Sequence, residues 1–186
     1  MKQLALNKSL CAVCALAVLA ALLVVGVGTA GASATGGASF VPPPPPPKKA
    51  KVVDGKAIAP RNAPPAVKRI IRAGNRIIGK PYKWGGGHGS LKKLDRGYDC
   101  SGTLSYALAG ARLMRSPLTS GSFMSWGRNG TGKWVTVYAH GGHAYMVVAG
   151  LRLDTSMRDD PSRTGPGWSK RLRRDDAFQA RHPRNL

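Results

Sequence analysis

The sequence predicts an α+β domain in which N-terminal helices pack on an antiparallel sheet. Two stretches with helical hydrophobic periodicity come first, and three β-branched or aromatic stretches joined by turn residues follow them. This order favours an α+β fold, because alternating βαβ units would place helices between the strands. Residues 64–186 carry all of these patterns, and a segment of about 120 residues is long enough to bury one hydrophobic core.

The first predicted helix starts beside Pro64 and Pro65, since proline is favoured at the first helical position. Gly79 suits the position just after the helix, and Pro81 stops it. Small and apolar residues recur on one face, which we expect to pack on the core: Val67, Ile70, Ile71, Gly74, Ile77 and Ile78.

The second predicted helix begins at Cys100 and ends near Met114. Asp99 is a good N-cap residue directly before it. Its apolar positions recur at helical spacing on one face: Leu104, Ala107, Leu108 and Ala111. Residues 116–132 are rich in Ser, Gly and Asn and are predicted to form a loop.

Three strands are predicted, and together they form an antiparallel meander: 134–138, 143–148 and 151–155. Residues 140–142 separate the first strand from the second, and Ala149-Gly150 forms the turn before the third. The remaining tail is polar and basic, with Trp168 and Phe178 as candidate anchors to the domain.

The N-terminal residues 1–34 have the features of a secretory signal peptide. Lysines near the start precede a long apolar run and then small residues, with cleavage expected after Ala34. Cleavage would remove Cys11 and Cys14 and leave no membrane span. An uncleaved anchor is the alternative, because an apolar run of roughly 18 residues can cross a bilayer.

A linker is predicted at residues 35–63. Six consecutive prolines at 42–47 favour an extended polyproline II rod, and lysines follow it. Such a rod would hold the folded domain, residues 64–186, away from the surface around the N-terminus. A proline-rich ligand for another domain is the alternative.

The charge of the chain is strongly positive. It has 29 Lys and Arg residues against eight Asp and no Glu, a formal net charge of +21. Such a charge attracts polyanions and acidic surfaces. For an exported protein we expect anionic cell-wall polymers as partners rather than nucleic acid, and we expect a monomer.

Cys100 is the only cysteine beyond the signal segment, so the mature chain can form no internal disulfide. At a helix start, unpaired N–H groups and the helix dipole favour an anion, and they can lower the pKa of a cysteine below its usual value of about 8.5. These features predict a nucleophilic thiol. A small, buried and inert cysteine is the alternative.

A nucleophilic cysteine needs a base, and His143 at the start of a predicted strand is the leading candidate. His140 is its competitor. A third polar group should orient the imidazole. Asp154 is the candidate carboxylate if the preceding turn has two residues, and Ser156 is the alternative, because a one-residue register slip reverses which face a side chain is on.

Zinc is a further candidate for these side chains, since Cys100, His88, His140 and His143 are suitable ligand types. Their spacing matches no compact zinc pattern. We therefore predict neither a metal nor a cofactor.

Two motifs and a histidine together resemble the NlpC/P60 cysteine peptidases. They are Pro81-Tyr82-x-Trp84-Gly85-Gly86, Asp99-Cys100-Ser101-Gly102 at a helix start, and Gly142-His143 at a strand start. The resemblance covers about residues 64–156 and preserves the order of the elements. It departs at His143-Ala144-Tyr145, where the family usually carries His-Val-Gly, and at the third polar residue, commonly His, Asn or Gln.

The resemblance implies a papain-like α+β fold and a secreted enzyme that hydrolyses peptide bonds in peptidoglycan stem peptides, often between D-Glu and diaminopimelate. It implies Cys100 as nucleophile and His143 as base. It places Tyr82 near the site and Asp99 and Ser101 near substrate. Trp84 and His88 are further candidates for substrate contact. An amidase or acyltransferase on the same fold, or an inactive basic wall-binding protein, are the alternatives.

Overall fold

The computed structural model describes residues 49–156, 164–174 and 176–186, and all of them belong to one compact unit. The predicted signal peptide, the proline rod, Cys11 and Cys14 lie outside the described residues. Within the described ranges, no helix is long and apolar enough to cross a lipid bilayer.

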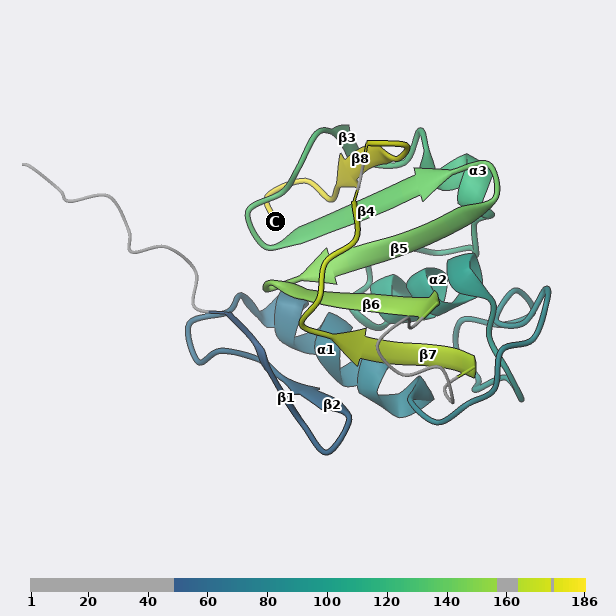
Figure 1. Ribbon diagram of the computed structural model, residues 1–186, viewed down its shortest axis with the longest axis horizontal. Helices are drawn as coiled ribbons and strands as arrows, with labels where there is room; N and C mark the ends of the chain where they lie inside the picture. Colours follow the sequence, from purple (N-terminus) through teal and green to yellow (C-terminus); the bar gives the residue numbers. More distant parts are fainter. Residues whose placement is uncertain (1–48, 157–163, 175) are drawn as a thin grey trace, which may run out of the picture. The chain divides into compact units, whose positions relative to one another are not determined.

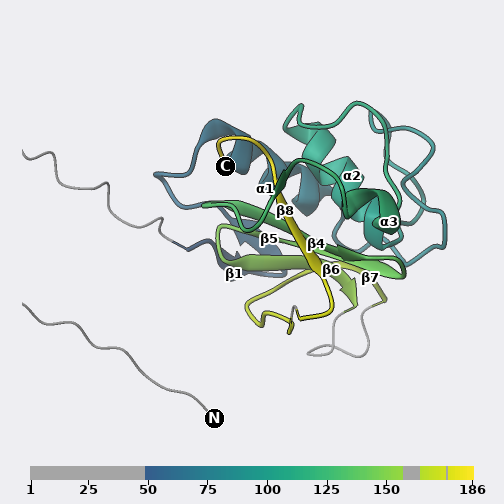
Figure 2. The ribbon, with the colours of Figure 1, turned by 90° about the horizontal axis from the view of Figure 1, so that it is seen from above.

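The predicted α+β fold is confirmed. A six-stranded sheet of antiparallel pairs has the order β3-β8-β4-β5-β6-β7. Helices α1 (Pro65–Ile77) and α2 (Cys100–Gly110) lie on one face of it (Figures 1 and 2). The strands are β3 (Arg128–Asn129), β4 (Val135–His140), β5 (His143–Val148), β6 (Leu151–Ser156), β7 (Thr164–Ser169) and β8 (Gln179–His182).

The three predicted strands correspond to β4, β5 and β6. Along each strand, successive side chains point to opposite faces of the sheet. The helix-facing side contributes fully buried members of the main core: Val135, Val137, Ala139, Ala144, Met146, Val148 and Leu153. The opposite side, here called the outer face, carries His143, Tyr145 and Asp154. The candidate site residues of the central strands therefore lie on the face that does not pack on the helices.

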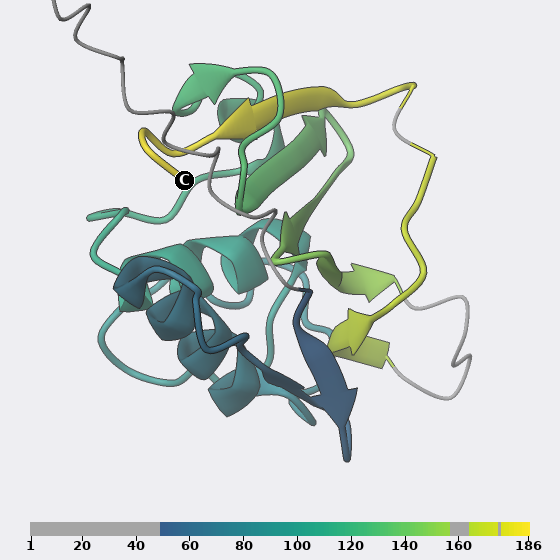
Figure 3. The same cartoon turned by 90° about the vertical axis from the view of Figure 1, so that its left-hand side faces the viewer.

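Helix α1 presents its predicted apolar stripe to the core and lies beside α2 (Figure 3). Gly74 allows Trp168 of β7 to approach closely, since a Cβ there would lie 2.7 Å from the ring carbon Cζ2 of Trp168. The indole Nε1 of Trp168 donates to Oδ1 of Asn75 at 2.9 Å. The candidate anchor Trp168 is thus a core residue within a strand that the sequence did not predict.

The folded part begins before residue 64, because a hairpin lies within residues 35–63, which were predicted to be a linker. Strands β1 (Lys51–Val53) and β2 (Lys56–Ile58) form a hairpin whose turn residues Asp54 and Gly55 both have positive φ. The side chain of Asn75 in α1 bonds the backbone N–H and carbonyl of Ala57 at 2.9 and 2.8 Å. These two bonds fix the hairpin to the domain.

Helix α2 begins at the predicted residue, Cys100, but ends at Gly110 rather than near Met114. Arg112 adopts φ of 62°, which a continuing helix does not allow. Residues 101–108 are buried on every side of the helix, not on one face only. The reason is tertiary: α1 covers the side that the sheet leaves free, and Gly110 permits that close packing because a Cβ there would collide with Ala73.

The predicted loop and the C-terminal tail, for which no element was predicted, both contain regular structure. Residues 116–132 include the short helix α3 (Ser120–Phe123), capped by the Thr119 hydroxyl, with Phe123 fully buried. The C-terminal tail supplies β7 and β8, and β8 lies between β3 and β4. Such pairings join distant parts of the chain, so local patterns did not reveal them.

Candidate active site

Cys100 is the first residue of α2, and its partly exposed thiol is free. Asp99 caps the helix, with Oδ1 accepting from the backbone N–H of Gly102 at 2.7 Å. The glycine loop of residues 85–87 lies against this helix start, because a Cβ on Gly102 would collide with the carbonyl oxygen of Gly86. The helix start that carries the thiol is therefore capped and packed closely against this loop.

The carboxylate of Asp99 joins the glycine loop to the helix. Besides the cap, Oδ1 contacts Nε2 of His88 at 3.0 Å and accepts from the Ser101 hydroxyl at 3.2 Å, while Oδ2 accepts from the Gly85 N–H at 3.1 Å. Nε2 of His88 also lies 3.2 Å from the Ser101 hydroxyl. Asp99, His88 and Ser101 thus form one hydrogen-bonded group beside the thiol.

The predicted site residues Tyr82 and Trp84 both reach solvent, with 42% and 86% of their surface exposed. Tyr82 forms a parallel bridge with Tyr98, which brings it alongside the residues that precede Cys100. Burial raises the pKa of Tyr82, and the nearby charges of Cys100 and Asp99 raise it further. Tyr82 is therefore within electrostatic reach of the thiol.

His143 and Asp154 meet on the outer face, where Nε2 of His143 lies 2.9 Å from Oδ1 of Asp154. The turn between β5 and β6 has two residues, both with positive φ, and β6 pairs with β5 in the register Met146↔Leu153. That register puts Asp154 on the same face as His143. Ser156, the alternative third residue, donates its backbone N–H to Oδ1 of Asp154 at 3.0 Å.

The thiol of Cys100 and the imidazole of His143 perturb each other. Burial raises the pKa of Cys100, but hydrogen bonds from the His143 side chain and the backbone of Ala144 lower it by more. Burial lowers the pKa of His143, but hydrogen bonds with Asp154 and Cys100 raise it to about 9. Burial raises the pKa of Asp154, and its bond with His143 brings it below the usual range. These pKa shifts favour a row of three charged groups: the thiolate of Cys100, the imidazolium of His143 and the carboxylate of Asp154.

Two arginines flank the other oxygen of Asp154. Nε of Arg152, a buried neighbour on β6, lies 3.4 Å from Oδ2, and Nη1 of Arg173 lies 3.1 Å from it. Arg173 belongs to the chain between β7 and β8. Neither arginine was predicted from the sequence, in which Arg173 is one of several basic residues of the tail.

The other histidines of the sheet are engaged elsewhere. Nδ1 of His140 accepts from the Gly142 N–H at 3.0 Å, and its ring packs on Phe178 with centroids 4.4 Å apart. His182 lies in β8 with Nδ1 3.0 Å from the Pro183 carbonyl oxygen. Across residues 49–156, 164–174 and 176–186, no three His, Cys, Asp or Glu side chains are grouped so as to hold a metal ion.

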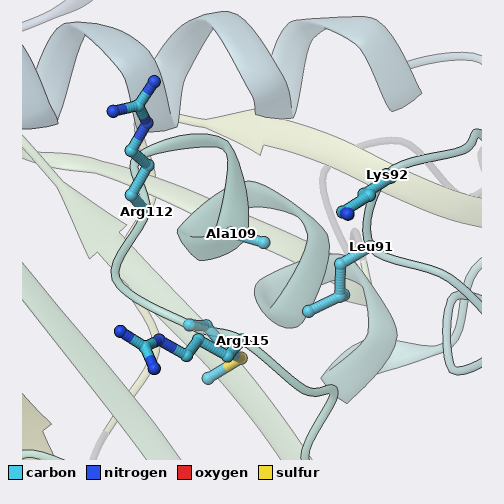
Figure 4. A pocket seen from close by; sticks show the side chains of 6 residues that line it. Leu91, Lys92, Ala109, Arg112 and Arg115 are labelled. Carbon is cyan, nitrogen blue, oxygen red and sulfur yellow. The ribbon is translucent and has the colours of Figure 1, made fainter.

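A separate pocket of about 460 Å³ lies at the opposite end of α2 (Figure 4). The guanidinium groups of Arg112 and Arg115, which line it, point in different directions. None of the candidate site residues lines it: its walls are Leu91, Lys92, Ala109, Arg112, Met114 and Arg115. The cationic groups do not converge on one point, so this pocket is no second candidate active site.

Comparison with known proteins finds partial relatives, and no family model matches the sequence. The peptidoglycan endopeptidase RipB of Mycobacterium tuberculosis (strain CDC 1551 / Oshkosh) is 40% identical over 75 residues, which are 37% of this chain and 31% of RipB. The peptidoglycan endopeptidase RipA of Mycobacterium tuberculosis (strain H37Rv) is 41% identical over 70 residues, 34% of this chain and 15% of RipA. The matched part of the chain is similar to these peptidoglycan endopeptidases, which supports the resemblance to the NlpC/P60 family. The matches span less than a third of the length of these relatives.

Solved structures of NlpC/P60 proteins are similar as well. A structure of the resuscitation promoting factor interacting protein RipA shares 24% identity over 72% of this chain and 71% of its own, with a TM-score of 0.47. The P60 domain of an antigen from M. avium paratuberculosis shares 21% identity over 63% of this chain and 93% of its own, with a TM-score of 0.46.

Proposed function

We propose that this chain is a secreted cysteine endopeptidase of the NlpC/P60 type that hydrolyses peptide bonds in peptidoglycan stem peptides. The observation that carries the proposal is the row formed by Cys100 at a capped helix start, His143 and Asp154. A nucleophile, a base and a group that orients the base form the minimal set for covalent acyl transfer. The similarity to named peptidoglycan endopeptidases favours a wall peptide as the substrate.

The first half of the proposed reaction forms a thioester. The thiolate of Cys100 attacks the scissile carbonyl carbon, and the tetrahedral oxyanion accepts hydrogen bonds from backbone N–H groups at the helix start, including that of Cys100. The imidazolium of His143 gives its proton to the amide nitrogen as the C–N bond breaks. The amine leaves, and His143 becomes neutral.

The second half releases the acyl group. Neutral His143 takes a proton from water, whose oxygen attacks the thioester carbonyl, and the thiolate of Cys100 leaves. Asp154 holds the imidazole ring through Nε2 in both halves and stabilises the imidazolium. No residue in these steps requires a metal or a cofactor.

We propose that the substrate contacts the protein beside the Cys100 thiol, on the side where the glycine loop lies. Tyr82 and Trp84 offer exposed aromatic surface there. Ser101 and His88 offer polar groups, and Asp99 acts mainly by holding these two side chains and the loop in place. The proposed scissile bond is the one between D-Glu and diaminopimelate.

The proposed location is the cell wall. The signal peptide at 1–34 would export the chain, and the linker would space the catalytic domain from its surroundings. The net charge of +21 supports binding of anionic wall polymers rather than nucleic acid. We propose that the protein acts there as a monomer.

Digestion of purified peptidoglycan, analysed by mass spectrometry, tests the proposal. The wild-type protein should release fragments with a new amino terminus at the stem peptide, and Cys100→Ala should release none. Fragment masses that show cleavage of the glycan–peptide amide or transfer to an amine would instead indicate an amidase or an acyltransferase. Equal release by both proteins would overturn the cysteine mechanism.

A further inference from the structure

The chain between β7 and β8 runs across the outer face of the sheet, opposite the helices (Figures 1 and 2). We call its described residues, 170–174 and 176–178, the crossing segment. Phe178 anchors it: its ring centroid lies 4.4 Å from that of His140 and 5.0 Å from that of Tyr145. Tyr145, fully buried and stacked on Tyr138 at 4.9 Å, forms the floor beneath.

Arg173 is the residue by which the crossing segment reaches the catalytic row. Its Nη1 lies 3.1 Å from Oδ2 of Asp154 and 3.5 Å from Nε2 of His143. Its guanidinium carbon lies 5.7 Å from the ring centroid of Tyr145 and 5.8 Å from that of Phe178. Two aromatic rings and one carboxylate therefore fix the position of this cation.

The contact with His143 differs in kind from the contact with Asp154. Nε2 of His143 donates its proton to Oδ1 of Asp154, so it has no lone pair for Arg173. When His143 is protonated, the 3.5 Å approach of Nη1 brings two positive charges together. Arg173 thus stabilises the carboxylate and opposes the imidazolium at the same time.

Other charged groups also face the imidazole. They are the thiol of Cys100 on α2 and the carboxylate of Asp154 on β6 with its second cation Arg152. The ring of His140, at the end of β4, also lies near, with its centroid 6.5 Å away. Asp154 is thus shared by three cationic groups.

We propose that Arg173 is a positioning residue of this site: bound to Oδ2 of Asp154, it holds a positive charge beside His143 that limits how firmly the imidazole keeps its proton. This inference rests on the proposed roles of Cys100 and His143. An imidazolium that is too stable delivers its proton slowly to the leaving amine, because a catalytic acid works best when its pKa is near the working pH. The crossing segment then belongs to the catalytic apparatus, although it lies far from Cys100 in sequence.

The test is the pH dependence of Cys100 alkylation by iodoacetamide in the full-length protein, followed by mass spectrometry of the peptide that contains Cys100. The alkylation rate should rise a second time at alkaline pH, when His143 loses its proton and the thiolate loses its partner. Arg173→Gln should move this second rise upward by about one pH unit, the shift expected for a unit charge removed at this separation in a water-like medium.

Three variants make the result specific. Arg173→Lys keeps the charge and should leave the second rise near its wild-type position. Arg173→Met keeps the aliphatic stem between the rings and should shift the rise as Arg173→Gln does, which covers the case in which the glutamine variant does not fold. Arg171→Gln removes an equal charge from an exposed position on the same segment and should cause no shift.

An upward shift in Arg173→Gln or Arg173→Met, absent in Arg173→Lys and Arg171→Gln, supports the proposal. An unchanged or lowered second rise in folded Arg173 variants overturns it. The assay uses no peptidoglycan, so its outcome does not depend on whether the wall peptide is the substrate. Failure of the proposed function would show instead as absence of fragments from wild-type digestion of peptidoglycan.

Discussion

Replacing Asp154 by Asn tests the central ion pair most informatively. The substitution removes the negative charge 2.9 Å from Nε2 of His143 but keeps an oxygen that can accept its proton. It also leaves Arg152 and Arg173 beside the imidazole without a carboxylate. Both effects disfavour the imidazolium.

The magnitude follows from the shift that the structure imposes on His143. Its pKa is raised from 6.5 to about 9, and the bond with Asp154 is the largest cause that raises it. A shift of this size corresponds to about 3 kcal/mol in favour of the imidazolium, and we assign roughly half to two-thirds of it to Asp154, or about 2 kcal/mol. Asp154→Asn should therefore lower the pKa of His143 by one to two units, in round figures about 1.5.

The assay is kcat/KM on a soluble stem peptide as a function of pH. His143 must be protonated to release the amine in the proposed mechanism. Activity should therefore fall as the pH rises through the pKa of His143, which is about 9 in the wild type. In Asp154→Asn the alkaline fall should begin about 1.5 units lower, with roughly fourfold loss of activity at pH 8 from this shift alone. Asp154→Glu keeps the negative charge, so its activity should fall at an alkaline pH close to that of the wild type.

Asp54→Asn is the matched control, because it makes the same chemical change in the turn of the β1–β2 hairpin, where Asn before Gly is well tolerated. It should leave the profile unchanged. An alkaline fall at the same pH in Asp154→Asn and in the wild type would refute the electrostatic role of Asp154.

Three further predictions concern the fold and the partner. Gly74→Ala should destabilise the domain by about 1–3 kcal/mol in denaturant unfolding, because its Cβ would lie 2.7 Å from Cζ2 of Trp168; unchanged stability would contradict the close packing. A chain that starts at residue 64 should melt at lower temperature than one that starts at residue 49, because Asn75 loses two hydrogen bonds to Ala57; equal melting would show that the hairpin is dispensable. Binding to an anionic wall polymer should weaken steadily with added salt, whereas salt-independent binding would exclude charge as its cause.

Local chemistry accounts for what the sequence revealed about the site. Asp99 before Cys100 is a capping signal that depends on adjacent residues only, so the helix start was predictable. The pairing of His143 with Asp154 follows from a two-residue turn and strand alternation, which fix register over a short distance. The sequence left Ser156 open because a slip of one residue exchanges the two faces.

Long-range packing accounts for what the sequence did not reveal. Arg173 reaches Asp154 only because β7 and β8 are far apart in the sheet and the chain must cross between them. The β1–β2 hairpin has strands of three residues, too short for a visible alternation, and it is held mainly by Asn75 of α1. Patterns within one segment carry no information about such contacts.

The most direct measurement is a time course of stem-peptide cleavage by purified wild-type and Cys100→Ala proteins, followed by mass spectrometry. The wild type should produce two fragments that together contain one added water, and Cys100→Ala, with its helix cap intact, should leave the peptide whole. Cleavage at the same bond and rate by Cys100→Ala would contradict the proposal that Cys100 is the nucleophile.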